Sequence, residues 1–272
     1  MTLPWHAQFV PSWLHGQLYK LNEHISRVAL CGDRLKDQDR IYRLLSSAFS
    51  GLDGYCASNA EAASIDAVSG EAASQNGEVT VDGARLILEA LLETDQQGPS
   101  QGAVVLDLGS GVGRFVAAVA VLEGAGRVDR CIGVELCPSR HARAQIARDR
   151  LRSSAGNGDE RSRFARMEVC LGDMLRAHDA ISACSHVYIA SLLFSTETME
   201  KLAELFEAAP HLCAVATLQD FPQSAPWSFI WDGRVVRARM DWHEDWHSGG
   251  SDVLIYRRPY RSAARPTSRA TS

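Results

Sequence analysis

The chain has 272 residues, 46% of them hydrophobic, which is enough to bury the core of one domain with an additional N-terminal piece. Its formal net charge of −5 argues against a protein that binds polyanions over its whole surface, although a local basic patch is compatible with it. No run approaches the ~18 apolar residues of a membrane helix, and residues 1–10 lack the pattern of a signal peptide. We therefore expect a protein without a membrane segment.

The cysteines indicate a reducing compartment, either cytosol or nucleus. The seven of them form an odd, scattered set without a Cys-x-x-Cys pair, which is typical of reduced thiols. Three of them, Cys131, Cys170 and Cys213, lie in strand-like apolar runs, so we expect these three side chains to be buried.

The first third of the chain is predicted to contain a helical extension and a loop. Apolar residues recur at helical spacing through residues 1–55, which predicts helices that pack on the main domain. Residues 56–75 are rich in Ala, Ser and Gly with interspersed acids, which predicts a flexible loop. A further helix is expected after residue 76, with Asp82 as its N-cap. Its predicted apolar face consists of Leu86, Ile87, Ala90 and Leu91.

Residues 104–122 have the pattern of a strand, a glycine turn and a helix. The apolar start predicts a buried parallel strand, and three alternate glycines predict a turn whose backbone closely approaches a ligand. Arg114 stands where a dinucleotide-binding fingerprint requires Gly or Ala, so the loop fits S-adenosylmethionine better than NAD. The residues of this stretch that we expect at the cofactor are Asp107, Gly109, Ser110, Gly111 and Gly113.

Two further predicted strands also end in an acid. Glu135 ends the second strand, where a carboxylate would accept hydrogen bonds from both ribose hydroxyls. Asp173 ends the third strand, where its carboxylate would accept from an adenine amino group. Their neighbours Leu136 and Met174 are expected beside the cofactor as well, with Met174 against the adenine ring. Because all three acids fall at one edge of the sheet, they predict the ligand crevice of an open α/β sheet.

The remaining elements complete an α/β architecture. A helix over 139–152 is expected to turn Ala142, Ile146 and Leu151 inward and its arginines outward. A helix is predicted over 196–208. Strands are predicted over 186–194, 212–218, 234–242 and 252–258, the last two as an antiparallel hairpin with a long loop. The predicted fold is the Rossmann-like, seven-stranded sheet of class I methyltransferases, with a C-terminal hairpin and a helical N-terminal extension.

Several motifs in this order resemble the histone H3 lysine methyltransferases that lack a SET domain and are named for disruption of telomeric silencing. The resemblance extends over residues 76–258, which we expect to form the methyltransferase domain, while residues 259–272 are expected to form a basic disordered tail. The motifs that carry it are DLGSGVGRFV (107–116), NGEVTVDGARLILEALL (76–92), GVEL (133–136), LGDM (171–174), YIASLLFSTETMEKLAELF (188–206) and ARMDWHEDWHSGGSDVLIYRR (238–258).

The resemblance implies further site residues. Gly77 and Glu78 match the family's Gly-Glu pair, which helps to enclose the methionine end of the cofactor. Trp242 and Tyr256 match its Trp-then-Tyr hairpin, which would wall the lysine channel, although the residues alone leave open that both are core aromatics. Ser191 and Phe194 complete the implied catalytic set. The chain departs from the family at Asn76, Val79 and Ala190-Ser191, where the family has a tyrosine, a threonine and two asparagines.

Three other functions are less well supported by the sequence. Residues 243–247 spell His-Glu-x-x-His, but the string follows a strand pattern and precedes two glycines, so we expect no metal site. The segment 191–194 lacks the two prolines with which methyltransferases of nucleic-acid bases hold a flipped base. A fold that binds cofactor without catalysis is opposed by the presence of all three strand-end acids.

The function implied is S-adenosylmethionine-dependent methylation of a protein lysine, on histone H3 in nucleosomes. A non-histone lysine is the alternative, followed by a base amine in nucleic acid. From Arg257 onward the chain carries five arginines and no acid, which indicates contact with nucleosomal DNA. These expectations place the protein in the nucleus, with the cytoplasm as the alternative.

Overall fold

The structure is a computed structural model that describes residues 32–70, 74–75, 77–93, 102–122, 127–156, 158–224, 227–240 and 250–259. The chain divides into two compact units, Met1–Leu44 and Leu45–Ser272. In the first unit only the beginning of helix α2 (Gly32–Ala48) is described. Among the described helices, none has the length and apolar character needed to cross a membrane.

The second unit is built on a seven-stranded sheet with the order β3-β2-β1-β4-β5-β7-β6. Its first five strands are parallel to one another, and β7 is antiparallel to both β5 and β6. The predicted seven-stranded α/β fold with a C-terminal hairpin is therefore confirmed. The strands are β1 (Ala103–Leu108), β2 (Val128–Glu135), β3 (Met167–Leu171), β4 (His186–Ile189), β5 (Ala214–Thr217), β6 (Ile230–Ala238) and β7 (Ser251–Arg257).

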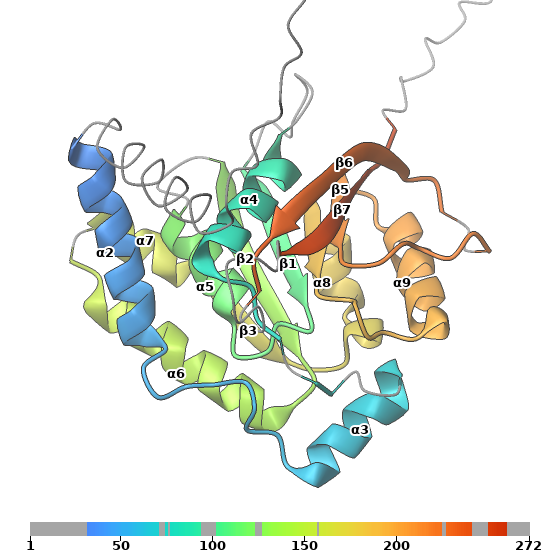
Figure 1. The fold of residues 1–272 in the computed structure, drawn as a ribbon, viewed down its shortest axis with the longest axis horizontal. Coiled ribbons are helices and arrows are strands. Elements are labelled where there is room, and N and C mark those ends of the chain that lie inside the picture. Colours follow the sequence, from blue (N-terminus) through green and yellow to red (C-terminus); the bar gives the residue numbers. More distant parts are fainter. Residues whose placement is uncertain are drawn as a thin grey trace, which may run out of the picture. The chain divides into compact units, whose positions relative to one another are not determined.

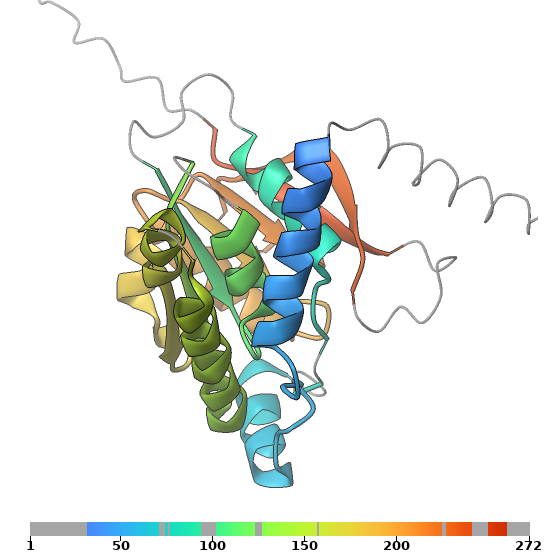
Figure 2. The same ribbon diagram turned by 90° about the vertical axis from the view of Figure 1, so that its left-hand side faces the viewer.

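Helices pack in two groups around this sheet (Figures 1 and 2). The first group contains α4 (Val81–Leu92), α5 (Arg114–Leu122), α6 (Pro138–Ser154) and α7 (Gly158–Ala165), and the second contains α8 (His178–Ala183) and α9 (Thr196–Ala208). Helix α3 (Asn59–Ser69), drawn in cyan, belongs to neither group and lies at one end of the sheet in both views. This end is the one at which the parallel strands terminate, because α3 bonds to the loops that follow β2 and β4.

The prediction of a flexible loop over 56–75 is wrong for residues 59–69, which form α3. The helix begins with a capping box, in which the Ser58 hydroxyl accepts from the Glu61 backbone N–H and the Glu61 carboxylate accepts from the Ser58 N–H. This reciprocal arrangement satisfies two backbone donors that a helix start otherwise leaves unpaired. The Ala-rich composition that indicated a loop is also favourable inside a helix.

Three predictions about helix faces need correction. Thr80, not Asp82, caps α4, and Leu88 is buried there in place of Leu86. In α6 the buried stripe runs through Arg140, Ala144, Ala147 and Leu151. Ala142 and Ile146 are exposed, because residues three to four positions apart share one face of a helix and the buried face of α6 contains residues 140, 144, 147 and 151.

Two of the three cysteines expected in the core are exposed. Cys131 is buried on β2, whereas Cys170 lies on the edge strand β3 and Cys213 just before β5. An edge strand and a strand entrance are covered by fewer neighbours than a central strand, so a strand-like pattern alone overestimates burial there.

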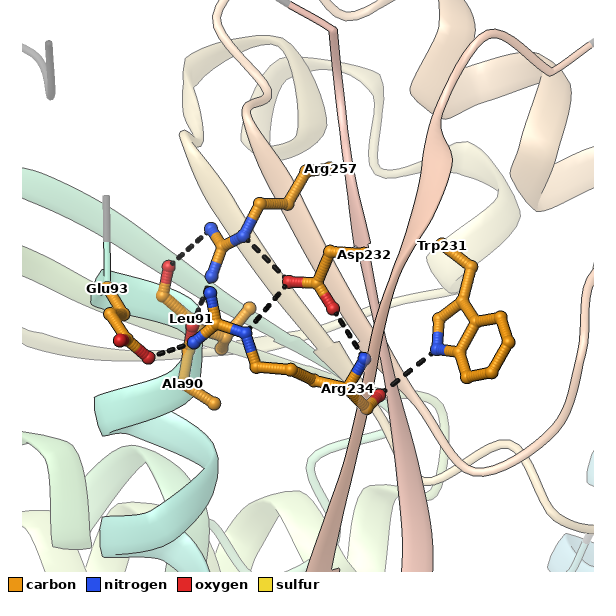
Figure 3. Close-up of polar contacts among 7 residues, drawn as sticks. All are labelled: Ala90, Leu91, Glu93, Trp231, Asp232, Arg234 and Arg257. Atoms are coloured by element: carbon orange, nitrogen blue, oxygen red, sulfur yellow. Dashed lines mark hydrogen bonds and ion pairs between the residues drawn. The ribbon is translucent and has the colours of Figure 1, made fainter. Parts of the chain in front are cut away.

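The C-terminal hairpin is fastened to the end of helix α4 by a polar network (Figure 3). Arg257 of β7 donates to Asp232 of β6 at 2.9 Å and to the last backbone carbonyls of α4. Arg234 binds both Asp232 and Glu93, the residue that ends α4. Cations at the C-terminal end of a helix can donate hydrogen bonds to its unpaired carbonyls, and they interact favourably with the negative end of its dipole. This network fixes the outer strands relative to α4.

Candidate functional site

A cavity of about 410 Å³ opens where the parallel strands end. This volume falls within the roughly 300–1,000 Å³ of small-molecule sites. Its walls come from the loops after β1, β2, β3, β4 and β5, from α6, and from residues of α3 and the segment that follows it. The carboxyl ends of parallel strands are where open α/β sheets bind ligands.

The loop between β1 and α5 forms one wall of the cavity. Gly109, Gly111 and Gly113 all have positive φ angles, 79°, 58° and 85°, which side chains rarely adopt. Gly109 and Gly111 line the cavity, and a Cβ added at Gly109 would meet only the ring of Phe194, at 3.6 Å. The loop is held by the N–H groups of Gly109 and Ser110, which both donate to the Val134 carbonyl of β2. Gly109 and Gly111 therefore leave the backbone bare toward the cavity, as predicted.

Glu135 lies at the centre of the polar end of the cavity. One carboxylate oxygen accepts from the Gly111 N–H at 2.7 Å, and the other accepts from the Cys137 N–H at 2.8 Å. Burial raises the pKa of Glu135, while these backbone donors and the nearby charge of Arg140 oppose the rise. Each carboxylate oxygen has a second acceptor site, so the group can still accept from two ligand hydroxyls.

Three further predicted residues line the same end. Asp173 caps the short helix η1 (Met174–Arg176), since one of its oxygens accepts from the Leu175 N–H at 2.8 Å. Leu136 and Met174 flank the two acids in the cavity wall. The structure thus brings together the strand-end residues that the sequence analysis assigned to ribose and adenine.

Besides Gly113, where an added Cβ would meet Ala144 of α6, three other predicted cofactor residues do not line the cavity and lie behind its wall. Asp107 is buried, and burial together with the charges of Glu135 and Glu78 raises its pKa well above the usual range. Glu78 forms an ion pair with Arg114, whereas its neighbour Gly77 does line the cavity. The Ser110 side chain is buried against Gly133. We assign these three residues to the support of the loop and not to direct contact.

The other end of the cavity is apolar. It is formed by the turn after β4 and the residue after β5, and it consists of Ala190, Leu192, Leu193, Phe194 and Leu218. The Phe194 N–H donates to the Ser191 carbonyl at 2.9 Å, which closes the turn. The Gln219 amide donates to the carbonyls of both Ser191 and Phe194, at 2.6 and 3.1 Å. These bonds rigidify the turn without prolines.

Two residues of the implied catalytic set, Ser191 and Tyr256, have buried side chains that bond to other parts of the protein. The Ser191 side chain is fully buried, with its hydroxyl bonded to Thr217 at 2.7 Å and to the Leu218 N–H at 3.1 Å, so it supports the turn from behind. Tyr256 packs edge-on against Phe221 and Trp227 in the core and donates to Asp220 at 2.7 Å. This side chain does not line the described cavity, and the expectation that Tyr256 walls an acceptor channel stays a prediction. Trp242 lies outside the described residues.

Among the cavity residues that sequence reasoning missed, four lie outside the strands and the loops that follow them. Ile65 and Ser69 come from α3, Gln75 from the segment after it, and Arg140 from the first turns of α6. The capping box Ser58-x-x-Glu61 was a readable signal for α3. No comparable signal existed for Arg140, because an arginine on an arginine-rich helix is usually a solvated one.

No group of three or more metal-binding side chains occurs within the part of the chain that the structure describes. The His-Glu-x-x-His string at 243–247 lies outside that part.

Comparison with known proteins agrees with this arrangement. Residues 85–227, more than half of the chain, match the family described as histone methylation protein DOT1. The chain belongs to this family. The family carries the class I fold that the strand order shows, and S-adenosylmethionine is its cofactor. No match was found among curated individual proteins.

Three of the solved structures that are similar to this DOT1-family chain are described as methyltransferases, all at low sequence identity. A putative RNA methyltransferase from Pyrococcus horikoshii shares 13% identity over 81% of this chain and 98% of its own, with a TM-score of 0.45. TrmN from Thermus thermophilus shares 17% over 66% and 52%, with a TM-score of 0.43. The magnesium protoporphyrin IX methyltransferase from Synechocystis, solved with bound S-adenosylmethionine, shares 15% over 66% and 78%, with a TM-score of 0.39. The family assignment rests on the sequence match and not on these partial likenesses.

The described residues of this DOT1-family methyltransferase fit its cofactor. The groups in the wall match the ligand: the Glu135 carboxylate can accept from the ribose hydroxyls, Asp173 and Met174 can contact the adenine, and the backbone is open at Gly109 and Gly111.

Proposed function

We propose that this DOT1-family methyltransferase modifies the ε-amine of a protein lysine, and that the protein is histone H3 in nucleosomes. The observation that carries the proposal is the apolar end of the cavity, which Ala190, Leu192, Leu193, Phe194 and Leu218 line without a titratable side chain. The family match supports the choice of a histone. A nuclear location and a role in chromatin belong to the same proposal.

An apolar entrance suits a lysine because only the neutral amine can attack a methyl group. The free ammonium has a pKa of about 10.4, so it must lose a proton before the reaction. Removal from water disfavours the charged form and lowers this pKa. Leu192 and Leu193 would surround the stem of the lysine, and the amine would release its proton to solvent as it loses water at the entrance. No side-chain base is needed in this scheme.

The residues of the turn orient the acceptor. When bound, S-adenosylmethionine supplies the methyl group. Phe194, with its ring 3.6 Å from the Cβ position of Gly109, would bound the space between the two ends of the cavity. Gln219 holds the turn from the neighbouring strand end through its two hydrogen bonds. Together they would keep water away from the reacting atoms.

The charge around the apolar end supports a basic partner. Residues 170–224, which include β4, α9 and β5, contain seven carboxylates against one arginine and one lysine. Of these, Asp220 and Glu197 are exposed close to the ends of β5 and β4 that form the apolar end, with Glu197 in an ion pair with Lys201. An acidic surface attracts a lysine-rich protein and speeds its association. This favours a histone over a nucleic acid as the bound acceptor.

The arginine tail can assist only with the arginines that remain available. Arg257 binds Asp232 and the end of α4, and Arg258 donates to the Phe206 and Ala209 carbonyls and lies over the Phe229 ring. Both are therefore structural. Arg261, Arg265 and Arg269 lie outside the described residues, and we propose that they contact nucleosomal DNA.

The test incubates the protein with labelled cofactor and three acceptors: nucleosomes, free core histones, and naked DNA or RNA. We expect label on H3 of nucleosomes, and a rate that falls with added salt and with deletion of residues 260–272. The variant Gly109→Leu, in which a side chain would occupy the cavity, serves as the control for contaminating activities. Label on a non-histone protein alone, tested in a nuclear extract, would keep the lysine chemistry and overturn the histone. Label on nucleic acid alone would overturn both.

A further inference from the structure

The cavity wall contributed by α3 is attached to the rest of the unit at both of its ends. At its start, the Glu61 carboxylate accepts from the N–H and hydroxyl of Ser139, at the beginning of α6. At its end, the Ser69 carbonyl accepts from the Ser195 N–H at 2.9 Å and from the Thr198 hydroxyl at 3.1 Å, at the beginning of α9. Helix α3 therefore spans from the loop after β2 to the loop after β4.

The segment that follows α3 is fastened in a different way. The Ser74 N–H donates to the Asp66 carboxylate of α3 at 2.7 Å. The Ser74 carbonyl accepts from the Arg140 guanidinium of α6 at 2.5 Å. Ser74 is thus held between two helices, and the next residue, Gln75, lines the cavity.

Arg140 also binds the segment that leads into α3. Its Nε donates to the Gly54 carbonyl at 2.8 Å. The side chain is 6% exposed and lines the cavity beside Glu135. A buried guanidinium is costly unless its donors are paired, and here it joins three segments: the approach to α3, the exit from α3 and α6 itself.

Arg140 is in addition the positive charge that faces the buried carboxylates. It lies close enough to Glu135 to oppose the effect of burial on the pKa of that carboxyl. Among the described residues of this region, the other cations are each paired with a carboxylate: Arg114 with Glu78, and the exposed Arg176 with Asp173 at 3.7 Å. The groups concerned are Asp107 on β1, Glu78 before α4, Arg114 on α5, Glu135 on β2 and Asp173 after β3.

We propose that Arg140 is a positioning residue of the cofactor site, which closes the cavity by tying both flanks of α3 to α6 and places its positive charge in the wall that also contains Glu135. The inference rests on the assignment of this cavity to S-adenosylmethionine. Arg140 reaches Gly54 and Ser74 through two nitrogens that its planar guanidinium holds apart, whereas an ammonium has all of its donors on one nitrogen and supplies the same charge as a single point. The two functions of Arg140 can therefore be separated by substitution.

The experiment measures cofactor affinity by calorimetry as a function of pH, together with melting temperature. For Arg140→Met we expect at least about tenfold weaker binding, the size of one lost charged hydrogen bond. We also expect the loss of affinity at acid pH to begin at a higher pH than in the wild type, because the carboxylate has lost its counter-charge. Arg140→Lys should retain the wild-type pH profile but bind about as weakly as Arg140→Met. The matched control is Arg143→Met on the same helix, which should bind normally.

A second variant keeps the proposal testable if Arg140→Met fails to fold. Asp66→Ala removes the other bond to Ser74, and it should weaken cofactor binding several-fold without moving the pH profile. The double variant with Arg140→Lys should lose less than the sum of the single losses, since both act on Ser74. Affinity and pH profile that stay at wild-type values while only the melting temperature falls would overturn the proposal. A wild-type protein that does not bind S-adenosylmethionine would instead overturn the cofactor site itself.

Discussion

The two ends of the cavity use opposite chemistry. At the tips of β2 and β3 the wall is polar, with Glu135 and Asp173 held by backbone N–H groups at 2.7–2.8 Å. At the tips of β4 and β5 it is apolar, and the polar groups of its turn are bonded on the side away from the cavity.

This difference follows from what each end is proposed to do. A nucleoside has fixed hydroxyls and amines, and prepositioned acceptors can recognise them without change. A lysine must change its protonation state before it reacts, and an apolar surface promotes this change while a carboxylate would oppose it. The contrast can be tested by blocking the polar end, by removing its charge, and by placing a charge at the apolar end.

The strongest effect is expected from blocking the polar end. Gly109→Leu places a side chain in the cavity at a position with φ of 79°, and we expect more than about 100-fold loss of cofactor affinity in calorimetry. The matched control is Gly233→Leu on β6, with φ of 82° and no atom within 4 Å of the added Cβ. It carries the same backbone strain and should bind normally. Equal losses in both variants would assign the effect to strain.

Removing the charge at Glu135 should have the next largest effect. Glu135→Gln is expected to cost about 1.5–3 kcal/mol of cofactor binding, or roughly 10–100-fold in affinity. In the wild type, affinity should decrease as the pH falls through the raised pKa of this carboxyl, and the variant should lack that dependence. A pH profile that is the same in both proteins would contradict the ribose assignment.

The stability of the protein should depend on pH in the opposite direction to its cofactor affinity. Because the pKa of Glu135 is raised in the folded state, its favourable contribution is complete below the ordinary carboxyl pKa and is lost as the pH rises through the raised value. The variant without cofactor should therefore melt higher than the wild type at neutral pH. Differential scanning calorimetry without ligand measures this directly.

A charge at the apolar end should impair the acceptor and not the cofactor. Leu192 is 51% exposed at the rim, and Leu192→Lys is expected to raise the KM for a lysine acceptor about tenfold through charge repulsion. Cofactor affinity should change less than threefold, and added salt should reduce the defect. Leu86→Lys on α4, 44% exposed and away from the cavity, is the control. A defect that salt leaves unchanged would argue against repulsion.

The smallest effect is expected in the aromatic core beside the apolar end. Burial and the bond to Asp220 raise the pKa of Tyr256, so its hydroxyl stays a donor. Tyr256→Phe should cost about 1 kcal/mol of unfolding free energy with no change in methyl transfer. Tyr188→Phe removes a buried hydroxyl that has no hydrogen-bond partner among the described residues, and it should be neutral or stabilising. Loss of turnover in Tyr256→Phe at unchanged stability would support the channel role.

The polar end could be predicted from the sequence because each of its parts is local. A strand, an acid and alternate glycines within a few residues specify the backbone of the β1–α5 loop, and Glu135 follows from the same pattern one strand later. The order of strands then places them together without any knowledge of side-chain contacts.

The rest depends on contacts between distant residues. Arg140 on an arginine-rich helix gives no sign that it meets carbonyls 66 and 86 positions earlier in the chain. Ser191 was expected at the reaction centre, but its hydroxyl bonds to Thr217 and faces away from the cavity. Tyr256 was placed by its position in the hairpin, whereas packing against Phe221 and Trp227 decides where its ring lies.

The attachment of α3 has a consequence for the synthesis of the protein. Its C-terminal end is bonded to Thr198, 129 positions further along the chain, so the cavity cannot be complete until α9 has left the ribosome. Contacts this distant form late, because their loop must close before they contribute. A ligand that binds only the completed cavity then adds its binding free energy to the finished fold alone. The supply of S-adenosylmethionine in the cell would thereby influence how much of the newly made protein survives, as well as how fast it works.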